Sequence, residues 1–308
     1  MNLAFITAQQ VAVLFILIFT GFICIKAGVL KAEGKKAFSD ILIYLIVPAM
    51  IINSYITEFN EEVFKKLVEA FKYSTILLVL GLVITVVLGF KIKDKNAPIV
   101  KIACIFSNAA YMGFPLIQAL FGTEGLLYAS AFLTVYNILL WTVGYAMISG
   151  KADFKEVVHS ICTTPVIISV VIGIVILVFQ IPVHSIIKQP LSYVGNMNTP
   201  LSMIITGMII ADSSFSKIVK NKLVLFAILV RMLVIPVVCI CLFKLLNIRG
   251  EVSNIVLLLQ ACPCAAITSV FAVQFGYDED LAAGSVVVTT FLSIVTLPLF
   301  AYVITTFM

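Results

Sequence analysis

The chain has 308 residues, of which 62% are hydrophobic and only 11% are charged, and its mean hydropathy is +1.18. Soluble domains carry about 25% charged residues, so this composition excludes a water-soluble globular protein. The net charge of +5 does not indicate nucleic-acid binding, because the lysines lie between apolar runs rather than in a basic stripe. We expect an all-α integral membrane protein that contacts the lipid bilayer and no nucleic acid.

Apolar segments of roughly 20 residues, the length that crosses a bilayer as a helix, recur along the chain. The first carries no basic residue ahead of its apolar run, so we interpret it as a membrane span and not as a secretory signal. The connections are short, and the longest polar stretch is Thr57–Lys72. Ten spans are predicted in chain order, at residues 4–25, 37–56, 71–91, 98–121, 124–148, 157–180, 189–211, 222–246, 252–275 and 280–305.

Lysine and arginine are distributed unevenly over the connections between these spans. The connections after the first, third, fifth and seventh spans hold thirteen of the twenty basic residues, whereas the even-numbered connections hold six. The positive-inside rule places the odd-numbered connections in the cytoplasm. Both termini are therefore predicted to face outward.

The two halves of the chain resemble each other when the sequence is shifted by 154 residues, half of its length. Phe121-Gly122 then meets Phe275-Gly276, and spans one to five fall on spans six to ten within a few residues. Each half has an odd number of spans, so the second half enters the membrane from the opposite side. The sequence thus predicts a 5+5 inverted repeat, residues 1–148 and 157–308, which is a common architecture of secondary transporters.

Spans four and nine each contain a helix-breaking proline, Pro115 with Gly113 before it and Pro263, so both helices are predicted to break near the membrane midplane. Unwound backbone at that depth is tolerated only where it is buried in protein or lines a watery cavity. A half-helix starting there presents free N–H groups and a partial positive charge of about half a unit. Pro115 suits the first turn of such a half-helix, and Asn108 can cap it or donate its amide to a carboxylate. A single kink is common in membrane helices, so the matched pair of breaks is what predicts an anion site.

Polar residues elsewhere in the spans complete the set of candidates. Tyr136, Asn137 and Thr268 lie inside spans, where polar side chains often only join neighbouring helices. The full set of predicted substrate-binding residues is Asn108, Ala109, Ala110, Gly113, Pro115, Tyr136, Asn137, Arg231, Cys262, Pro263, Cys264, Ala265 and Thr268.

Arg231 is the only basic residue well inside a span. Its burial costs at least about 2.5–3.5 kcal/mol, and a snorkelling side chain recovers only part of that depth. Two interpretations stay open: Arg231 guides or binds an anion, or it pairs with helix-end carbonyls of a neighbouring span.

Acidic residues are absent from the midplane, since all fifteen lie in connections or at span ends. Proton and sodium coupling commonly use an intramembrane acid, so we predict a sodium-independent carrier, with Asp40 as the best proton candidate. The seven cysteines are an odd number in apolar surroundings, and the two histidines lie at span edges. They predict no disulfide framework, metal site or other cofactor.

The segment Asn108–Leu116, with the sequence Asn-Ala-Ala-Tyr-Met-Gly-Phe-Pro-Leu, resembles the fourth-helix motif of the auxin efflux carrier family. That family includes the plant PIN-formed auxin exporters, which carry Asn-x-x-x-Met-Gly-x-Pro-Leu there, and bacterial relatives. Many bacterial members carry Asn-x-Gly-Phe-x-Gly-x-Pro, in which this chain replaces the first Gly and the Phe by Ala110 and Tyr111. Pro263 and Leu297-Pro298 also match the family pattern.

The resemblance implies a secondary carrier of small organic anions, such as auxin-like monocarboxylates or malate- and malonate-like dicarboxylates, in a bacterial plasma membrane. It implies a fold like that of the bile acid:sodium symporters, whose sodium-holding acid has no equivalent in residues 258–274. Spans 1, 2, 6 and 7 would form a scaffold that makes a homodimer, and spans 3–5 and 8–10 a transport domain that moves like an elevator. The chain is not predicted to be an enzyme. A non-transporting ligand sensor or lipid-binding module and a channel remain alternatives.

Overall fold

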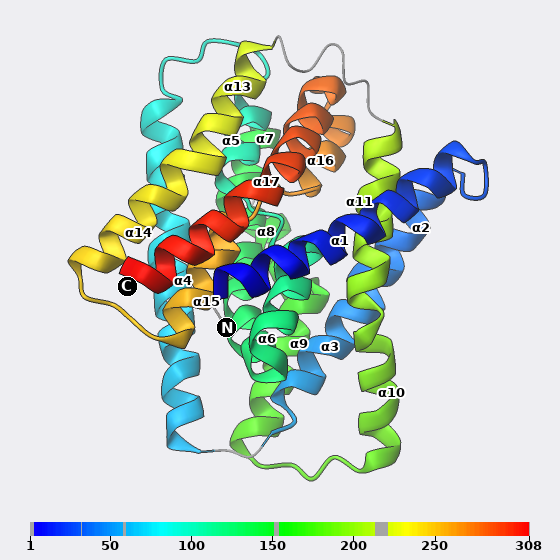
Figure 1. Ribbon diagram of the computed structural model, residues 1–308, viewed down its shortest axis with the longest axis vertical. Helices are drawn as coiled ribbons and strands as arrows, with labels where there is room; N and C mark the ends of the chain where they lie inside the picture. The colour runs from blue at the N-terminus through cyan, green and yellow to red at the C-terminus, as the bar shows by residue number, and fades with distance from the viewer. Residues whose placement is uncertain (1–2, 32, 58–59, 151–153, 213–220, 308) are drawn as a thin grey trace.

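The computed structural model describes residues 3–31, 33–57, 60–150, 154–212 and 221–307, and these residues form a bundle of helices (Figure 1). The predicted all-helical membrane protein is confirmed. Both chain ends lie near mid-height in the view of Figure 1, and α1 and α17 rise obliquely from them across the front. The helices of the first half are α1 (Leu3–Lys26), α2 (Gly34–Ile41), α3 (Val47–Tyr55), α4 (Glu61–Leu88), α5 (Ala97–Ile105), α6 (Phe114–Leu139) and α7 (Tyr145–Ser149). Those of the second half are α8 (Phe154–Thr163), α9 (Pro165–Val178), α10 (Ser185–Asn196), α11 (Asn198–Asp212), α13 (Lys222–Leu229), α14 (Ile235–Leu245), α15 (Glu251–Ala261), α16 (Ile267–Phe275) and α17 (Glu279–Phe307).

Four π-helical stretches occur in the part of the chain that the structure describes, and three of them end two residues before a proline. They are η1 (Leu42–Ile46), η2 (Ala109–Gly113), η3 (Leu140–Gly144) and η4 (Val230–Val234). Pro48, Pro115 and Pro236 each follow the end of η1, η2 or η4 by two residues. A proline offers no N–H to the carbonyl four residues earlier and its ring clashes with it. In each case that carbonyl lies inside the π stretch, where the wider turn relieves the clash.

Seven helices are long and apolar enough to cross a membrane by themselves, counted over the part of the chain that the structure describes, whereas the sequence predicted ten spans. Predicted spans four and five share one helical stretch from Ala109 to Ser149, kinked at Gly122, which has φ 65° and ψ −155°. Predicted span six is divided at Thr164, whose ψ of 118° reflects the preference of a residue before proline for extended backbone. Spans four and nine are divided at the breaks described below. The count of ten spans stays a prediction.

The third span begins earlier than predicted, because α4 starts at Glu61 and not at residue 71. The side-chain oxygen of Asn60 accepts a hydrogen bond from the backbone N–H of Val63 at 2.7 Å, which caps the helix. Glu61 and Glu62 lie in the first turn, where negative charge stabilises the helix dipole. Most of the polar stretch that we expected to be a connection is therefore helical.

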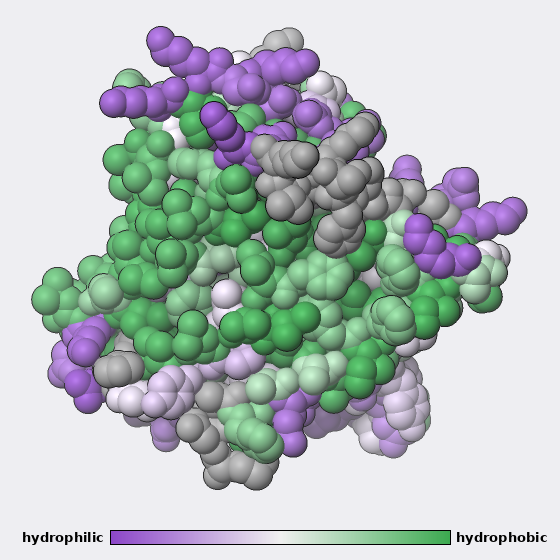
Figure 2. Space-filling model, turned by 45° about the horizontal axis from the view of Figure 1, so that its top comes forward, coloured by the Kyte–Doolittle hydropathy of each residue, from purple (hydrophilic) through white to green (hydrophobic). Residues whose placement is uncertain are grey.

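The face of the bundle seen in Figure 2 is mainly apolar, with hydrophilic side chains gathered at the top, at the right and along the lower edge. Large apolar side chains such as Ile16, Phe19, Val87 and Val295 are more than 60% exposed. A soluble monomer rarely exposes so large a contiguous apolar area. This surface fits the hydrocarbon of a membrane.

Candidate functional site

The centre of the molecule holds a crossing of two interrupted helices. The isolated bridge between Ser107 and Cys264 joins the extended residues after α5 to those after α15. The N–H of Asn108 donates to the carbonyl of Pro263 at 2.8 Å, and the N–H of Ala265 donates to the carbonyl of Phe106 at 2.9 Å. The helix breaks predicted in spans four and nine are therefore present, and the two broken segments pair with each other.

The first break lies further from Pro115 than the sequence suggested. The non-helical residues are 106–108, and helical structure resumes in η2 at Ala109. Pro115 does lie in the first turn of α6, but it widens the helix into η2 and does not interrupt it. Pro263 lies inside the second break, where the preceding residue Cys262 has extended backbone, with φ −60° and ψ 154°.

Four buried polar atoms at the crossing have no hydrogen-bond partner among the described residues: the Asn108 amide nitrogen and the hydroxyl oxygens of Ser107, Thr268 and Ser269. Asn108 is only 4% exposed and Thr268 is fully buried. Buried polar groups in proteins are nearly always paired, and leaving one unpaired costs about 1–3 kcal/mol. All four groups can donate a hydrogen bond. Unpaired donors at this point suit a ligand that brings acceptors.

The helix ends at the crossing have opposite polarity on its two sides. η2 begins at Ala109 and α16 at Ile267, and the first N–H groups of any helix lack partners within it. These ends carry a partial positive charge of about half a unit each. Ala109 is fully buried in the first turn, and Ala110 is half-buried beside it. We call this the amide side of the crossing.

α5 and α15 end at the same crossing and bring their carbonyl ends to it, which we call the carbonyl side. Arg231, from η4, is fully buried there. Its Nε donates to Cys262 O at 3.0 Å, and its Nη1 donates to Cys104 O at 3.2 Å and Ile105 O at 3.1 Å. Its Nη2 donates to the carbonyl of Gln260. Of the two interpretations of Arg231, these contacts match the pairing with helix-end carbonyls.

Two residues that the sequence analysis missed support the second break. Thr289 of α17 is fully buried, and its hydroxyl oxygen accepts a hydrogen bond from the N–H of Cys264 at 3.0 Å. Gln260 reaches α4, where its amide nitrogen lies 3.4 Å from the carbonyl of Leu77. Gly81 makes room for it, because a Cβ there would lie 2.9 Å from that nitrogen. Only the buried polar character of these residues could have indicated such roles.

Other predicted site residues are placed by packing. A Cβ at Gly113 would lie 2.6 Å from Leu259 Cδ2 and 3.4 Å from Cys262 Sγ, so this glycine lets η2 approach α15. The ring of Tyr136 packs edge-on against Phe106, with ring centroids 5.1 Å apart. Asn137 donates its amide to the carbonyl of Leu133 in its own helix at 2.7 Å, so this contact is local.

The cysteines at the crossing are unmodified thiols in an apolar setting. All seven cysteines are free, and Cys104, Cys239, Cys262 and Cys264 are buried around Arg231. Within the described ranges, no group of three or more histidine, cysteine or acidic side chains is placed to hold a metal ion.

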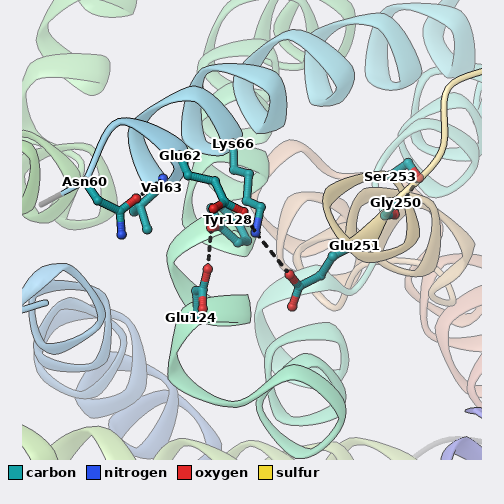
Figure 3. Close-up of polar contacts among 9 residues, drawn as sticks. All are labelled: Asn60, Glu62, Val63, Lys66, Glu124, Tyr128, Gly250, Glu251 and Ser253. Atoms are coloured by element: carbon teal, nitrogen blue, oxygen red, sulfur yellow. Dashed lines mark hydrogen bonds and ion pairs between the residues drawn. The ribbon is translucent and has the colours of Figure 1, made fainter. Parts of the chain in front are cut away.

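A second polar cluster lies at one end of the bundle, and its charged side chains are more exposed than Arg231 (Figure 3). Lys66 of α4 pairs with Glu62 at 2.9 Å and with Glu251 of α15 at 3.9 Å. Tyr128 of α6 donates to Glu124 at 2.6 Å. The side chains of Lys66, Glu62 and Glu251 are 30%, 75% and 37% exposed. We call this the outer cluster.

A cavity of about 620 Å³ opens near this end of the bundle. It lies between the end of α3, which contributes Asn53, the start of α4, the kinked part of α6 with Glu124, and α10 with Lys188 and Ser192. Its walls therefore come from both the predicted scaffold and the predicted transport domain.

Comparison with known proteins identifies the class of this molecule. A model of the membrane transport protein family matches the chain over residues 6–161 and again over residues 154–301. The chain therefore belongs to this family, the auxin efflux carrier family that its Asn108–Leu116 motif indicated.

Two archaeal relatives match along nearly their whole length. A protein of Methanocaldococcus jannaschii, described as an uncharacterized transporter, is 24% identical over 312 residues, which cover 97% of this chain and 99% of that protein. An uncharacterized transporter of Methanothermobacter thermautotrophicus is 21% identical over 306 residues, covering 97% of this chain and 98% of that protein.

Proposed function

We propose that this membrane transport protein is a sodium-independent secondary carrier of small organic anions, mono- or dicarboxylates, which bind on the amide side of the crossing. The observation that carries the proposal is the buried amide nitrogen of Asn108, which has no partner within the described chain. It stands at the start of η2, where the helix dipole favours negative charge. A carboxylate brings the acceptors and the charge that this position lacks.

The absence of acids from the crossing supports anion binding without sodium. No described acidic side chain is buried, whereas Arg231 contributes one buried positive charge. Moving one anion outward along an inside-negative potential releases about 2.3 kcal/mol per 100 mV, so export needs no coupling ion.

Paired helix contacts support the inverted repeat that this mechanism requires. α1 packs along α11, and α9 packs along α3, which is the same contact after the two halves are exchanged. A Cβ at Gly21 would lie 2.3 Å from Ile204 O, and a Cβ at Gly173 would lie 2.6 Å from the ring of Tyr55. The two glycines are separated by nearly the 154 residues that relate the halves.

The elevator movement is part of the same proposal. The scaffold of α1–α3 and α8–α11, which would also form the homodimer, contacts the transport domain of α4–α7 and α13–α17 through polar side chains. Gln118 of α6 donates to Asn196 of α10 at 3.3 Å, and Tyr55 of α3 is hydrogen-bonded to Ser130 of α6 at 2.8 Å. Such contacts have to break when one unit slides past the other.

Binding and flux measurements test the carrier. A thermal-shift screen of mono- and dicarboxylates on purified protein names the substrate, and counter-exchange in proteoliposomes distinguishes a carrier from a sensor or a channel. Asn108→Ala should weaken substrate binding at least about tenfold, the loss of one charge-assisted hydrogen bond of 1.5–3 kcal/mol. Its unliganded thermal midpoint should not fall below that of the wild type, because the buried amide nitrogen has no partner to lose. Asn254→Ala is the matched control, because Asn254 is half-buried in the first turn of α15.

Unchanged affinity and flux in Asn108→Ala would move the site elsewhere, and a requirement for a sodium gradient would contradict the uncoupled mechanism. Crosslinking tests the elevator: a crosslink between Gln118→Cys and Asn196→Cys, made with a short bifunctional thiol reagent, should stop flux, because the two side chains meet across the two units. The same reagent between Lys66→Cys and Glu251→Cys, both in the transport domain, should not. The native thiols to be replaced beforehand are the exposed or half-exposed ones, Cys24, Cys162 and Cys241.

A further inference from the structure

We infer that the carbonyl side of the crossing is a cation site made of backbone oxygens, and that Arg231 fills it with a tethered guanidinium. The site would accept a free guanidinium, or a monovalent metal ion, if the arginine side chain were removed. This makes Arg231 a positioning residue that holds the two broken helices together and keeps a fixed positive charge behind the substrate. Its role behind the substrate rests on the proposed function, but the cation site does not.

The first argument is the composition of the site. The guanidinium donates to four backbone carbonyls, and they come from two helices that are more than 100 residues apart in sequence. Two of them belong to the end of α5 and two to the end of α15 and the residue after it. Converging oxygens without a side-chain anion are the arrangement that binds weakly hydrated cations in proteins.

The second argument is the match of charge. The last carbonyls of a helix lack partners within it, and each such end carries about half a negative charge. Two ends meeting at one point therefore sum to about one negative charge, which one guanidinium neutralises. Within the described ranges, no acidic side chain lies within 4.0 Å of Arg231, so the carbonyls hold this charge by themselves.

The third argument is local structure. Arg231 lies in the π stretch η4, which ends two residues before Pro236. Its side chain is buried there between two other buried residues, Val230 and Met232. The equivalent position of the first half, 154 residues earlier, holds the apolar Leu77. The two equivalent positions of the inverted repeat therefore differ: one holds a cation and the other an apolar side chain. A guanidinium does not lose its proton in proteins, so the charge is permanent.

Cation rescue tests the inference. Arg231→Ala empties the site, and its thermal midpoint in detergent should fall by several degrees or more. Millimolar methylguanidinium chloride should restore at least half of that loss, and potassium or sodium chloride should restore more than choline chloride at equal ionic strength. Wild type and Arg249→Ala, which removes the chain's other, exposed arginine, should show no such response. A midpoint of Arg231→Ala that no cation raises would overturn the site.

A pair of milder variants keeps the test decisive if Arg231→Ala does not fold. Arg231→Lys retains a cation, whereas Arg231→Gln retains hydrogen-bond donors without charge. The lysine variant should unfold several degrees above the glutamine variant, and equal midpoints would show that charge is not what the carbonyls need. These readouts do not involve transport, so an absence of flux in the wild type together with intact rescue of Arg231→Ala would contradict the carrier and leave the cation site standing.

Discussion

Both sides of the crossing are made of helix ends, but their polar groups differ in hydrogen bonding. On the carbonyl side, four oxygens are paired with Arg231, whereas on the amide side the nitrogen of Asn108 and nearby hydroxyls are unpaired. Saturated hydrogen bonding stabilises a buried polar network, and unsaturated donors leave binding capacity. The difference shows that two properties of the broken helices belong to separate groups only a few residues apart. Their stability is assigned to the carbonyls paired with Arg231, and their capacity to bind an anion to the unpaired donors around Asn108.

Arg231→Met should give the largest effect, because it removes the cation and leaves four buried carbonyls unpaired. Breaking a buried charged network by removing one partner costs about 3–5 kcal/mol, and we expect a loss of that size in the free energy of unfolding. Detergent-solubilised yield and thermal midpoint measure it, with Arg249→Met as the control. A variant as stable as the wild type would remove the stabilising role of the carbonyl side.

Gly113→Ala should follow, because its Cβ would lie 2.6 Å from Leu259 Cδ2 where η2 meets α15. Overpacking of this kind costs about 1–3 kcal/mol. Gly34→Ala is the control, since a Cβ there would lie 3.7 Å from Phe38 Cε2, an ordinary van der Waals contact. Equal thermal midpoints for the two variants would show that the helices at the crossing do not pack this closely.

Thr289→Val tests the support of the second break and keeps the size of the side chain. The substitution removes the acceptor of the Cys264 N–H, and this N–H stays buried without a partner. An unpaired buried group costs about 1–3 kcal/mol, and we expect a loss in the free energy of unfolding near the lower end of that range. Thr290→Val serves as the matched control, since the hydroxyl of Thr290 donates only to Val286 O of its own helix. A larger loss in Thr290→Val than in Thr289→Val would contradict the proposed support.

Lys66→Met in the outer cluster should give the smallest effect. Its partners Glu62 and Glu251 are 75% and 37% exposed, and exposed ion pairs contribute about 0.2–1 kcal/mol. The difference from wild type in thermal midpoint should shrink further as salt is raised, because salt screens exposed charges. A loss of stability as large as that of Arg231→Met would show that the partly exposed Lys66 stabilises the protein as much as the buried Arg231 does.

The sequence predicted the class of fold and the presence of two helix breaks because those features depend on local chemistry. Long apolar runs and the prolines at 115 and 263 are visible in one dimension. The pairing of Ser107 with Cys264 could be expected only once the repeat suggested that the two breaks meet. The position of the first break was displaced, because a proline can be absorbed by a π-helical turn as well as by an interruption.

The partners of Arg231 and Thr289 could not be predicted, because they depend on how each helix is rotated about its axis. Two interpretations of Arg231 stayed open in the sequence, and the four carbonyl contacts match the pairing with helix-end carbonyls. The start of α4 was missed for a different reason: its first turns are polar, and capping by Asn60 counts for more there than hydropathy.

The contacts of Arg231 also order the events of biosynthesis. The carbonyl of Cys104 and the guanidinium that pairs with it are separated by 127 residues. At a synthesis rate of about 5–20 residues per second, the first broken segment waits on the order of 6–25 s before its arginine leaves the ribosome. During that interval α5 and η2 are in the membrane, or beside its insertion machinery, with a gap in their backbone hydrogen bonding. The crossing can therefore form only after the second half has been inserted. A ribosome that stalls before residue 231 leaves a first half whose α5 carbonyls have no guanidinium to pair with.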